Sequence, residues 1–127
     1  MNRMKLFIIE DDPVFTEMLK DFIADRPKWE VVAFSCGEDC IKEIHQNPHV
    51  AIIDYNLDCD HPGAMDGLQT MLEIKKLSPK AHCIFLSGQN SYAKALQTIS
   101  HGAETYIMKD ESAFEELGKI LDSIPAT

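Results

Sequence analysis

Short runs of apolar residues recur along this chain, and they limit what it can fold into. Four of the runs cover residues 6–9, 31–34, 50–53 and 83–86, and a weaker one covers 105–108. Runs of this length that are apolar at every position and end at polar residues are typical of parallel sheets, where both faces are covered. We therefore expect five strands that are buried on both sides.

Amphipathic stretches separate these runs. Their apolar residues recur every three or four positions, which is the period of a helix packed on one side. The residues that mark the five expected helices are Val14, Met18, Leu19, Phe22 and Ile23 after Pro13; Ile41 and Ile44; Leu68, Met71, Leu72 and Leu77; Ala93, Leu96 and Ile99; and Phe114, Leu117, Ile120 and Leu121. Ser112 and Glu115 have the spacing of a capping box, and Gly102 is placed as a C-cap.

Strands that alternate with helices leave few arrangements, because crossovers between parallel strands are right-handed. The economical choice is an α/β fold of flavodoxin type, a doubly wound five-stranded parallel sheet in the order 2-1-3-4-5 with five helices. The chain has 127 residues, of which 45% are hydrophobic. That is the size of one ordinary domain, so we expect a single domain over residues 1–127.

The charge of the chain narrows the classes of partner. Twelve Lys and Arg residues against 21 Asp and Glu residues give a net charge of −9. Clustered basic residues bind nucleic acid and anionic membranes, so neither is expected as a direct ligand. The apolar run from Leu6 stops at Glu10, far short of a membrane span or a signal peptide. We expect a cytoplasmic protein whose four cysteines are thiols.

Polar residues follow four of the five expected strands, at the edge where ligands bind in open α/β sheets. Taken singly, each has an ordinary explanation as a helix cap, a turn residue or a surface charge. Taken together, they place acids, a hydroxyl and a lysine at one edge of the sheet. These residues are Glu10, Asp11 and Asp12 after the first run, Asp54 after the third, Ser87 after the fourth and Lys109 after the fifth.

Carboxylates held close together repel one another unless they share a cation. Mg²⁺ prefers carboxylate and carbonyl oxygens and keeps open positions for phosphoryl oxygens. A lysine and a hydroxyl beside it can neutralise the remaining phosphoryl charge. A carboxylate in such a setting can act as the nucleophile and form an acyl phosphate. The spacing therefore predicts a magnesium-dependent phosphoryl site.

At these residues the chain resembles the receiver domain of two-component response regulators, from Lys5 to about Ile124. The matching motifs lie in the family's order at four strand ends. They are Ile8-Ile9-Glu10-Asp11-Asp12-Pro13, Ala51-Ile52-Ile53-Asp54, Phe85-Leu86-Ser87-Gly88 and Gly102-Ala103-Glu104-Thr105-Tyr106-Ile107-Met108-Lys109. One such motif is weak evidence, whereas four in order are specific.

The resemblance assigns a role to each of these residues. Asp54 is the expected phosphoacceptor, Lys109 contacts the phosphoryl group, and Ser87 and Tyr106 form the switch. The expected Mg²⁺ ligands are Glu10, Asp11, Asp54 and the backbone carbonyl of Asn56. Asp12 is left as the cap of the following helix.

The resemblance also implies partners. The phosphoryl donor is a phosphohistidine on a sensor histidine kinase or on a histidine phosphotransfer protein. The phosphorylated domain acts on a downstream protein effector or on a covalently linked output domain, and two receivers can pair as a homodimer. Such a domain is a signalling module and not an enzyme with an external substrate. The chain stops soon after the last expected helix, so we expect no output domain within it.

Two positions depart from the family pattern. The family usually has a glycine eight positions after the phosphoacceptor, whereas Asp54 and Gly67 are thirteen positions apart here. Many members carry proline after the lysine, where this chain has Asp110.

Other classes share part of the pattern. A haloacid dehalogenase-type phosphatase needs a second acid where this chain has Asn56, and a flavodoxin-type flavin domain needs a glycine-rich loop where it has Glu10-Asp11-Asp12. Cys59 and His61, with Asp58 or Asp60, do not have a recognised zinc spacing, and a solvated acidic loop is favoured. The main alternative is a pseudo-receiver, a protein-interaction module that works without phosphorylation.

Overall fold

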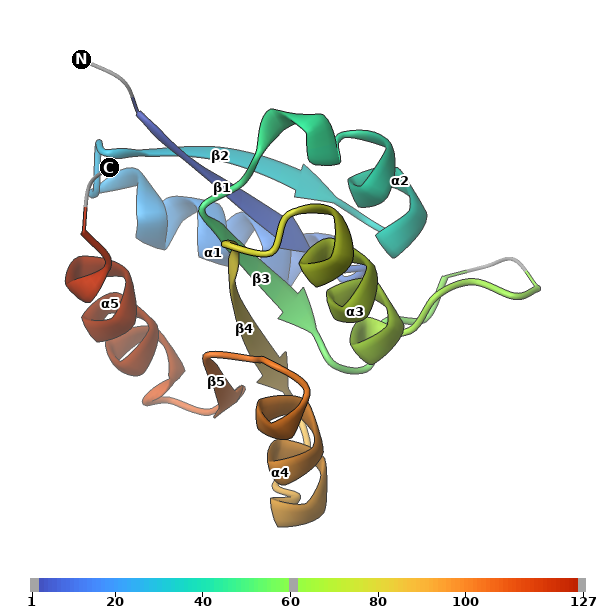
Figure 1. Ribbon diagram of the computed structural model, residues 1–127. Coiled ribbons are helices and arrows are strands. Elements are labelled where there is room, and N and C mark those ends of the chain that lie inside the picture. Colours follow the sequence, from blue (N-terminus) through green and yellow to red (C-terminus); the bar gives the residue numbers. More distant parts are fainter. Residues whose placement is uncertain (1–2, 60–61, 126–127) are drawn as a thin grey trace.

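A five-stranded parallel sheet forms the centre of the computed structural model, which describes residues 3–59 and 62–125 (Figure 1). The strand order is β2-β1-β3-β4-β5, so the predicted fold class is confirmed. The elements are β1 (Met4–Ile9), α1 (Pro13–Ala24), β2 (Trp29–Phe34), α2 (Gly37–Lys42), a short 3₁₀ helix (Ile44–Gln46), β3 (Val50–Asp54), α3 (Gly67–Leu77), β4 (His82–Ser87), α4 (Tyr92–Ser100), β5 (Thr105–Met108) and α5 (Ala113–Ser123).

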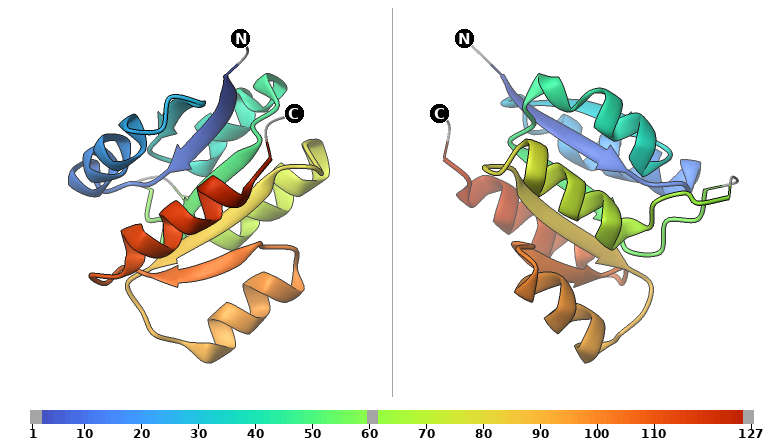
Figure 2. Two further views of the ribbon diagram at one scale, coloured as in Figure 1. Left: turned by 90° about the vertical axis from the view of Figure 1, so that its left-hand side faces the viewer. Right: turned by 45° about the vertical axis from the view of Figure 1, so that its right-hand side comes forward.

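Helices cover both faces of this sheet, with α1 and α5 on one side and α2, α3 and α4 on the other (Figures 1 and 2). Successive side chains of a strand point to opposite faces. Leu6 and Ile8 of β1 accordingly lie in the core with α1 and α5, and Phe7 and Ile9 lie in the core with α2 and α3. The two cores explain why the apolar runs of the central strands β1, β3 and β4 are buried on both faces. The expectation of burial on both sides is wrong for β2 and β5, which are only partly buried because they lie at the edges of the sheet.

Not every apolar residue of the expected helices faces these cores. In α1, Leu19 is buried, but Val14 is 68% exposed. In α4, Leu96 and Ile99 are exposed, whereas Thr98 is fully buried. The Thr98 hydroxyl donates to the Ala95 carbonyl inside the helix, so it can be buried without losing a hydrogen bond. The expected core face of α4 is therefore wrong.

The helix caps differ in part from the expected ones. Asp12 caps α1 as expected, accepting a hydrogen bond from the Val14 N–H at 2.9 Å. The expected capping box of α5 is wrong, because the Ser112 side chain caps no N–H of the helix. The Ser112 hydroxyl and N–H instead both donate to Asp110 Oδ1, at 2.8 and 2.9 Å. Asp110 therefore shapes the turn that leads into α5.

The parallel strands bring their carboxyl ends to one edge of the sheet. β1 and β3 are neighbours in register, with Ile9 beside Ile53, and β3 and β4 pair Asp54 with Leu86. The residues that follow these strands therefore start within a few ångströms of one another. Over residues 3–59 and 62–125, no helix is long and apolar enough to cross a membrane.

Candidate functional site

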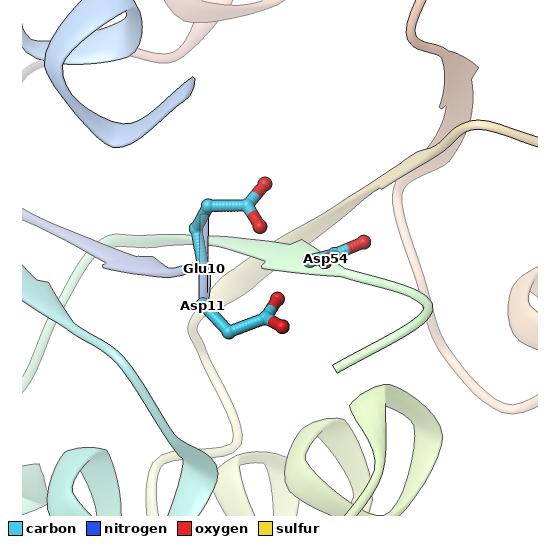
Figure 3. Close-up of side chains that lie close together, drawn as sticks. All are labelled: Glu10, Asp11 and Asp54. Carbon is cyan, nitrogen blue, oxygen red and sulfur yellow. The ribbon is translucent and has the colours of Figure 1, made fainter. Parts of the chain in front are cut away.

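Three carboxylates converge at this edge of the sheet, as Figure 3 shows. Glu10 and Asp11 follow β1, and Asp54 is the last residue of β3. One oxygen from each carboxylate lies within 4.8 Å of the others. Carboxylate oxygens are ligands that Mg²⁺ prefers, and three of them within this distance fit a single hard dication.

Burial makes the negative charge of this cluster unfavourable in the absence of a cation. Glu10 is 4% exposed and Asp54 is 6% exposed. Burial raises the pKa of Glu10 to about 7, since it outweighs the hydrogen bond from Lys109, and the nearby Asp54 carboxyl raises it further. Burial and the neighbouring Asp54 also raise the pKa of Asp11. A metal ion that shares these oxygens would therefore relieve an existing electrostatic cost.

Lys109 provides the positive charge of the site. Its Nζ lies 2.8 Å from Glu10 Oε1 and 3.5 Å from Asp54 Oδ1, and it sits 4.5 Å from the centre of the Phe15 ring. Burial alone lowers the pKa of this lysine, but the hydrogen bond with Glu10 and the charges of both acids raise it overall. The ammonium group is thus held charged beside Asp54. Its peptide bond to Asp110 is trans.

Ser87 and Asn56 complete the side of the site next to β4. The Ser87 hydroxyl oxygen is fully buried and accepts hydrogen bonds from the Gln89 N–H at 3.1 Å and from Asn56 Nδ2 at 3.5 Å. The Asn56 N–H donates to Asp54 Oδ1 at 3.1 Å and so fixes the orientation of that carboxylate. The assignment of the Asn56 carbonyl as a metal ligand stays a prediction.

An aromatic pair lies between the site and α4. Tyr106 is half-buried on β5 and donates a hydrogen bond to the Gln89 carbonyl at 3.0 Å. The Tyr106 and Tyr55 rings pack in a T-shaped arrangement, with 5.9 Å between their centroids. The Tyr55 hydroxyl donates to Gln97 Oε1 of α4 at 3.4 Å. Tyr55 directly follows Asp54, so it connects the acidic cluster to α4.

Tyr55 and Phe15 were not predicted as site residues from the sequence. Tyr55 is adjacent to a strand-end acid, and that position is the signal by which it could have been found. Phe15 belongs to the apolar stretch of α1, and nothing in its spacing indicates a contact with Lys109.

The long connection between Asp54 and Gly67 returns the chain to the same edge of the sheet. Leu57 packs into the core next to α2 and α3, and the Met65 N–H donates to Glu38 Oε2 at 2.7 Å. A Cβ at Gly67 would lie 2.5 Å from the Asp54 carbonyl oxygen, so α3 begins in close contact with β3. Asp60 and His61 of the zinc alternative lie outside the described residues.

Comparisons with known proteins agree with this geometry. The family model of the response regulator receiver domain matches residues 6–122. The transcriptional regulatory protein DegU of Brevibacillus brevis is 25% identical over 114 residues, which are 88% of this chain and 46% of DegU. The chemotaxis protein CheY of Listeria monocytogenes is 24% identical over 84% of this chain and 86% of CheY.

A solved structure of the RcsB response regulator of Salmonella typhimurium is 25% identical and superposes with a TM-score of 0.82 over 97% of this chain and 60% of RcsB. The chain thus spans less than half of DegU and most of CheY. The family model, the strand order and the acidic cluster at the strand ends all agree. The chain therefore belongs to the response regulator receiver domain family.

Proposed function

We propose that Asp54 accepts a phosphoryl group from a phosphohistidine on a sensor histidine kinase or a histidine phosphotransfer protein. The observation that carries this proposal is the environment of Asp54. Its carboxylate is buried, held by the Asn56 N–H and placed 3.5 Å from the Lys109 ammonium beside two further acids. An aspartate with only a structural role has no need of this combination.

In the proposed reaction, an Asp54 carboxylate oxygen attacks the phosphorus, and the bond between phosphorus and the donor imidazole nitrogen breaks. The other nitrogen of the donor ring carries a proton when the bond breaks, so the products are an acyl phosphate and a neutral histidine. Lys109 offsets negative charge on the phosphoryl oxygens, and the Ser87 hydroxyl can donate to one of them. A Mg²⁺ ion held by Glu10, Asp11, Asp54 and the Asn56 carbonyl would neutralise the carboxylates and the incoming phosphoryl charge.

The same contacts support a switch. Ser87 Oγ contacts Gln89, and the Gln89 carbonyl accepts the hydrogen bond from Tyr106. If Ser87 turns towards a phosphoryl group, it changes the position of Gln89 and removes a constraint on Tyr106. Phosphorylation then favours a second state in which the surface of α4, β5 and α5 differs.

The output is proposed to come through protein contacts. The switched surface acts on a downstream protein effector or on a covalently linked output domain, and pairing of two copies is an additional route. The net charge of −9 disfavours direct contact of this domain with nucleic acid. The domain assists its own phosphorylation and dephosphorylation and has no external substrate.

The phosphoacceptor is tested by incubating the protein with acetyl phosphate and Mg²⁺ and recording its intact mass. We expect one phosphoryl adduct that is absent with EDTA, is released by hydroxylamine and does not form in Asp54→Asn. An unchanged adduct in Asp54→Asn would overturn the assignment. Asp58→Asn is a matched control that removes a more exposed acid of the following loop and keeps the adduct.

The switch is tested by NMR of ring-labelled tyrosine with and without beryllofluoride and Mg²⁺. We expect the Tyr106 ring signal to shift on addition of the analogue, because the hydrogen bond from Tyr106 to the Gln89 carbonyl changes. Tyr106→Phe assigns the signal. A Tyr106 signal that stays unchanged while the analogue is bound would show that this ring is not part of a switch.

A further inference from the structure

Two cysteines lie near each other where the long loop after β3 approaches the end of β2. The Cys59 thiol donates to the Ser35 carbonyl oxygen at 3.4 Å. This oxygen belongs to the planar peptide unit that joins Ser35 to Cys36, so Cys59 Sγ lies next to the backbone of Cys36. The Cys36 side chain is also near enough to Cys59 to be one of the groups that raise the pKa of the Cys59 thiol.

These two thiols differ from the other pair in their access to reagents. Cys36 and Cys59 are each partly exposed, whereas Cys40 and Cys83 are buried. Burial raises the pKa of Cys40 to about 12 and that of Cys83 to about 11, so both remain protonated inside the core. A small disulfide in solution can therefore reach only the first pair directly.

The position of Cys59 gives the contact a structural consequence. Cys59 is five residues after Asp54, in the connection that is longer than the family pattern. Cys36 directly precedes α2, and Cys59 is close enough to Asp11 for the two groups to interact electrostatically. A bond between the two sulfurs would fasten this loop to the start of α2, beside the acidic cluster.

We propose that Cys36 and Cys59 are a redox-sensitive thiol pair, reduced in the present structure and able to form an intramolecular disulfide with a small-molecule disulfide as oxidant. In the exchange, one cysteine first attacks glutathione disulfide and releases one glutathione. The second cysteine then attacks this mixed disulfide and releases the other. Overall, two thiols and one glutathione disulfide give one protein disulfide and two glutathione molecules. The proposal does not depend on phosphorylation of Asp54.

The environment of Cys59 determines how formation of the disulfide between Cys36 and Cys59 should be measured. Burial, the nearby Cys36 and the acids Glu38 and Asp11 raise the pKa of Cys59 to about 11. A thiol that stays protonated reacts slowly, but its reaction rate does not set the final equilibrium. The test therefore uses equilibrium mixtures of reduced and oxidised glutathione in place of a short exposure to an oxidant.

The native protein is equilibrated in these mixtures, quenched in acid, alkylated in denaturant and analysed by mass spectrometry. Cleavage after Glu38 separates Cys36 from Cys40, so the cross-linked pair can be assigned. We expect a linked fragment that contains Cys36 and Cys59, a mass loss of two hydrogens and reversal by dithiothreitol. Amide hydrogen exchange around residues 57–59 should slow in the linked form.

Two variants distinguish this pair from other reactions. Cys59→Ser lies in a loop, and it should lose the linked fragment and leave Cys36 free or bound to glutathione. Cys83→Ala removes a buried thiol and should keep the link. Three outcomes would each refute the proposal: glutathione on both cysteines without a link, a link that uses Cys40, or a link between two molecules.

Discussion

The carboxyl group of Glu10 lies buried between a lysine and two other carboxylates, and it shows how a single residue reports on this site. Its position was predictable because it follows an apolar strand, and the structure brings it within 4.8 Å of Asp11 and Asp54. Its raised pKa was not predictable, because burial and the contact with Lys109 arise only when distant segments meet. The same is true of Tyr55, whose partners come from β4, β5 and α4.

Glu10 should make the stability of the metal-free protein depend on pH. Its pKa is about 7 in the folded protein and near the ordinary 4.5 in the unfolded chain, so the folded state binds more protons between these values. The free energy of unfolding should therefore rise as the pH falls from about 7 to about 4.5, by up to about 3 kcal/mol from this residue. Urea unfolding of wild type and Glu10→Gln, in EDTA at several pH values, measures the difference.

The variant cannot titrate at this position, so its stability relative to wild type should be greatest at high pH. Glu17→Gln on the exposed side of α1 is the matched control and should leave the pH profile unchanged. If the free energies of unfolding of wild type and Glu10→Gln changed with pH in the same way, the pKa of Glu10 would not be raised in the folded protein.

Lys109 should be the residue that stabilises the acidic cluster when no metal is bound. Lys109→Met removes the only ammonium group within 4.0 Å of Glu10 or Asp54 among the described residues. We expect the free energy of unfolding in EDTA to fall by about 2 kcal/mol, because buried carboxylates are left without a counter-charge. Mg²⁺ should then raise the melting temperature more in the variant than in wild type.

Thermal unfolding with and without Mg²⁺ tests this expectation. Lys119→Met is the control, because it removes an exposed lysine that pairs with Glu115 on α5. It should leave both the melting temperature in EDTA and its increase with Mg²⁺ nearly unchanged. An equal response of Lys109→Met and wild type to Mg²⁺ would contradict the electrostatic account of the site.

At the level of elements, helix positions followed the sequence better than helix faces and caps did. Apolar periodicity located α1, α3, α4 and α5. The exposed apolar residues of α4 could not be assigned to a face, because the periodicity does not say which neighbours the helix meets. A capping box forms at Asp66 and Gln69 of α3, whereas the one expected at Ser112 does not form.

The N-caps of α3 and α5 can be compared directly, because the N-cap residue is Asp66 in α3 and Ser112 in α5. Asp66 Oδ1 accepts from the Gln69 N–H at 2.8 Å, so Asp66→Ala should cost about 1 kcal/mol. Ser112→Ala should cost less, because Asp110 and not Ser112 accepts the hydrogen bonds at the start of α5. Urea unfolding of both variants measures the order, and a larger loss in Ser112→Ala would contradict the cap assignments.

Gly67 should be the glycine that allows α3 to begin against β3. A Cβ there would meet the backbone oxygens of Asp54 and Tyr55 at 2.5 and 2.8 Å. Gly67→Ala should therefore destabilise the fold by about 2 kcal/mol, because backbone atoms cannot move aside cheaply. Gly88→Ala is a matched control with open space around its Cβ, and urea unfolding should show a clearly smaller loss for it.

For the whole molecule, the alternation of strands and helices reduced the topology to a few arrangements, and the order 2-1-3-4-5 was the economical choice among them. The runs of β1, β3 and β4 have both faces covered, those of the edge strands β2 and β5 are only partly buried, and the right-handed crossover rule leaves few arrangements. The site follows from that topology, since parallel strands bring Glu10, Asp54, Ser87 and Lys109 to one edge. The contacts of the long loop, such as those of Met65 with Glu38 and Cys59 with Ser35, depend on its conformation and were not predictable.

Asp54 and its neighbours are proposed to form a competent phosphoacceptor pocket. Binding of beryllofluoride, measured by fluorine NMR with and without Mg²⁺, tests this claim most directly because it does not depend on the lifetime of an acyl phosphate. We expect one bound analogue per chain in wild type, and none in EDTA or in Asp54→Asn. Absence of binding to folded wild-type protein with Mg²⁺ would show that the pocket is not competent and indicate a pseudo-receiver.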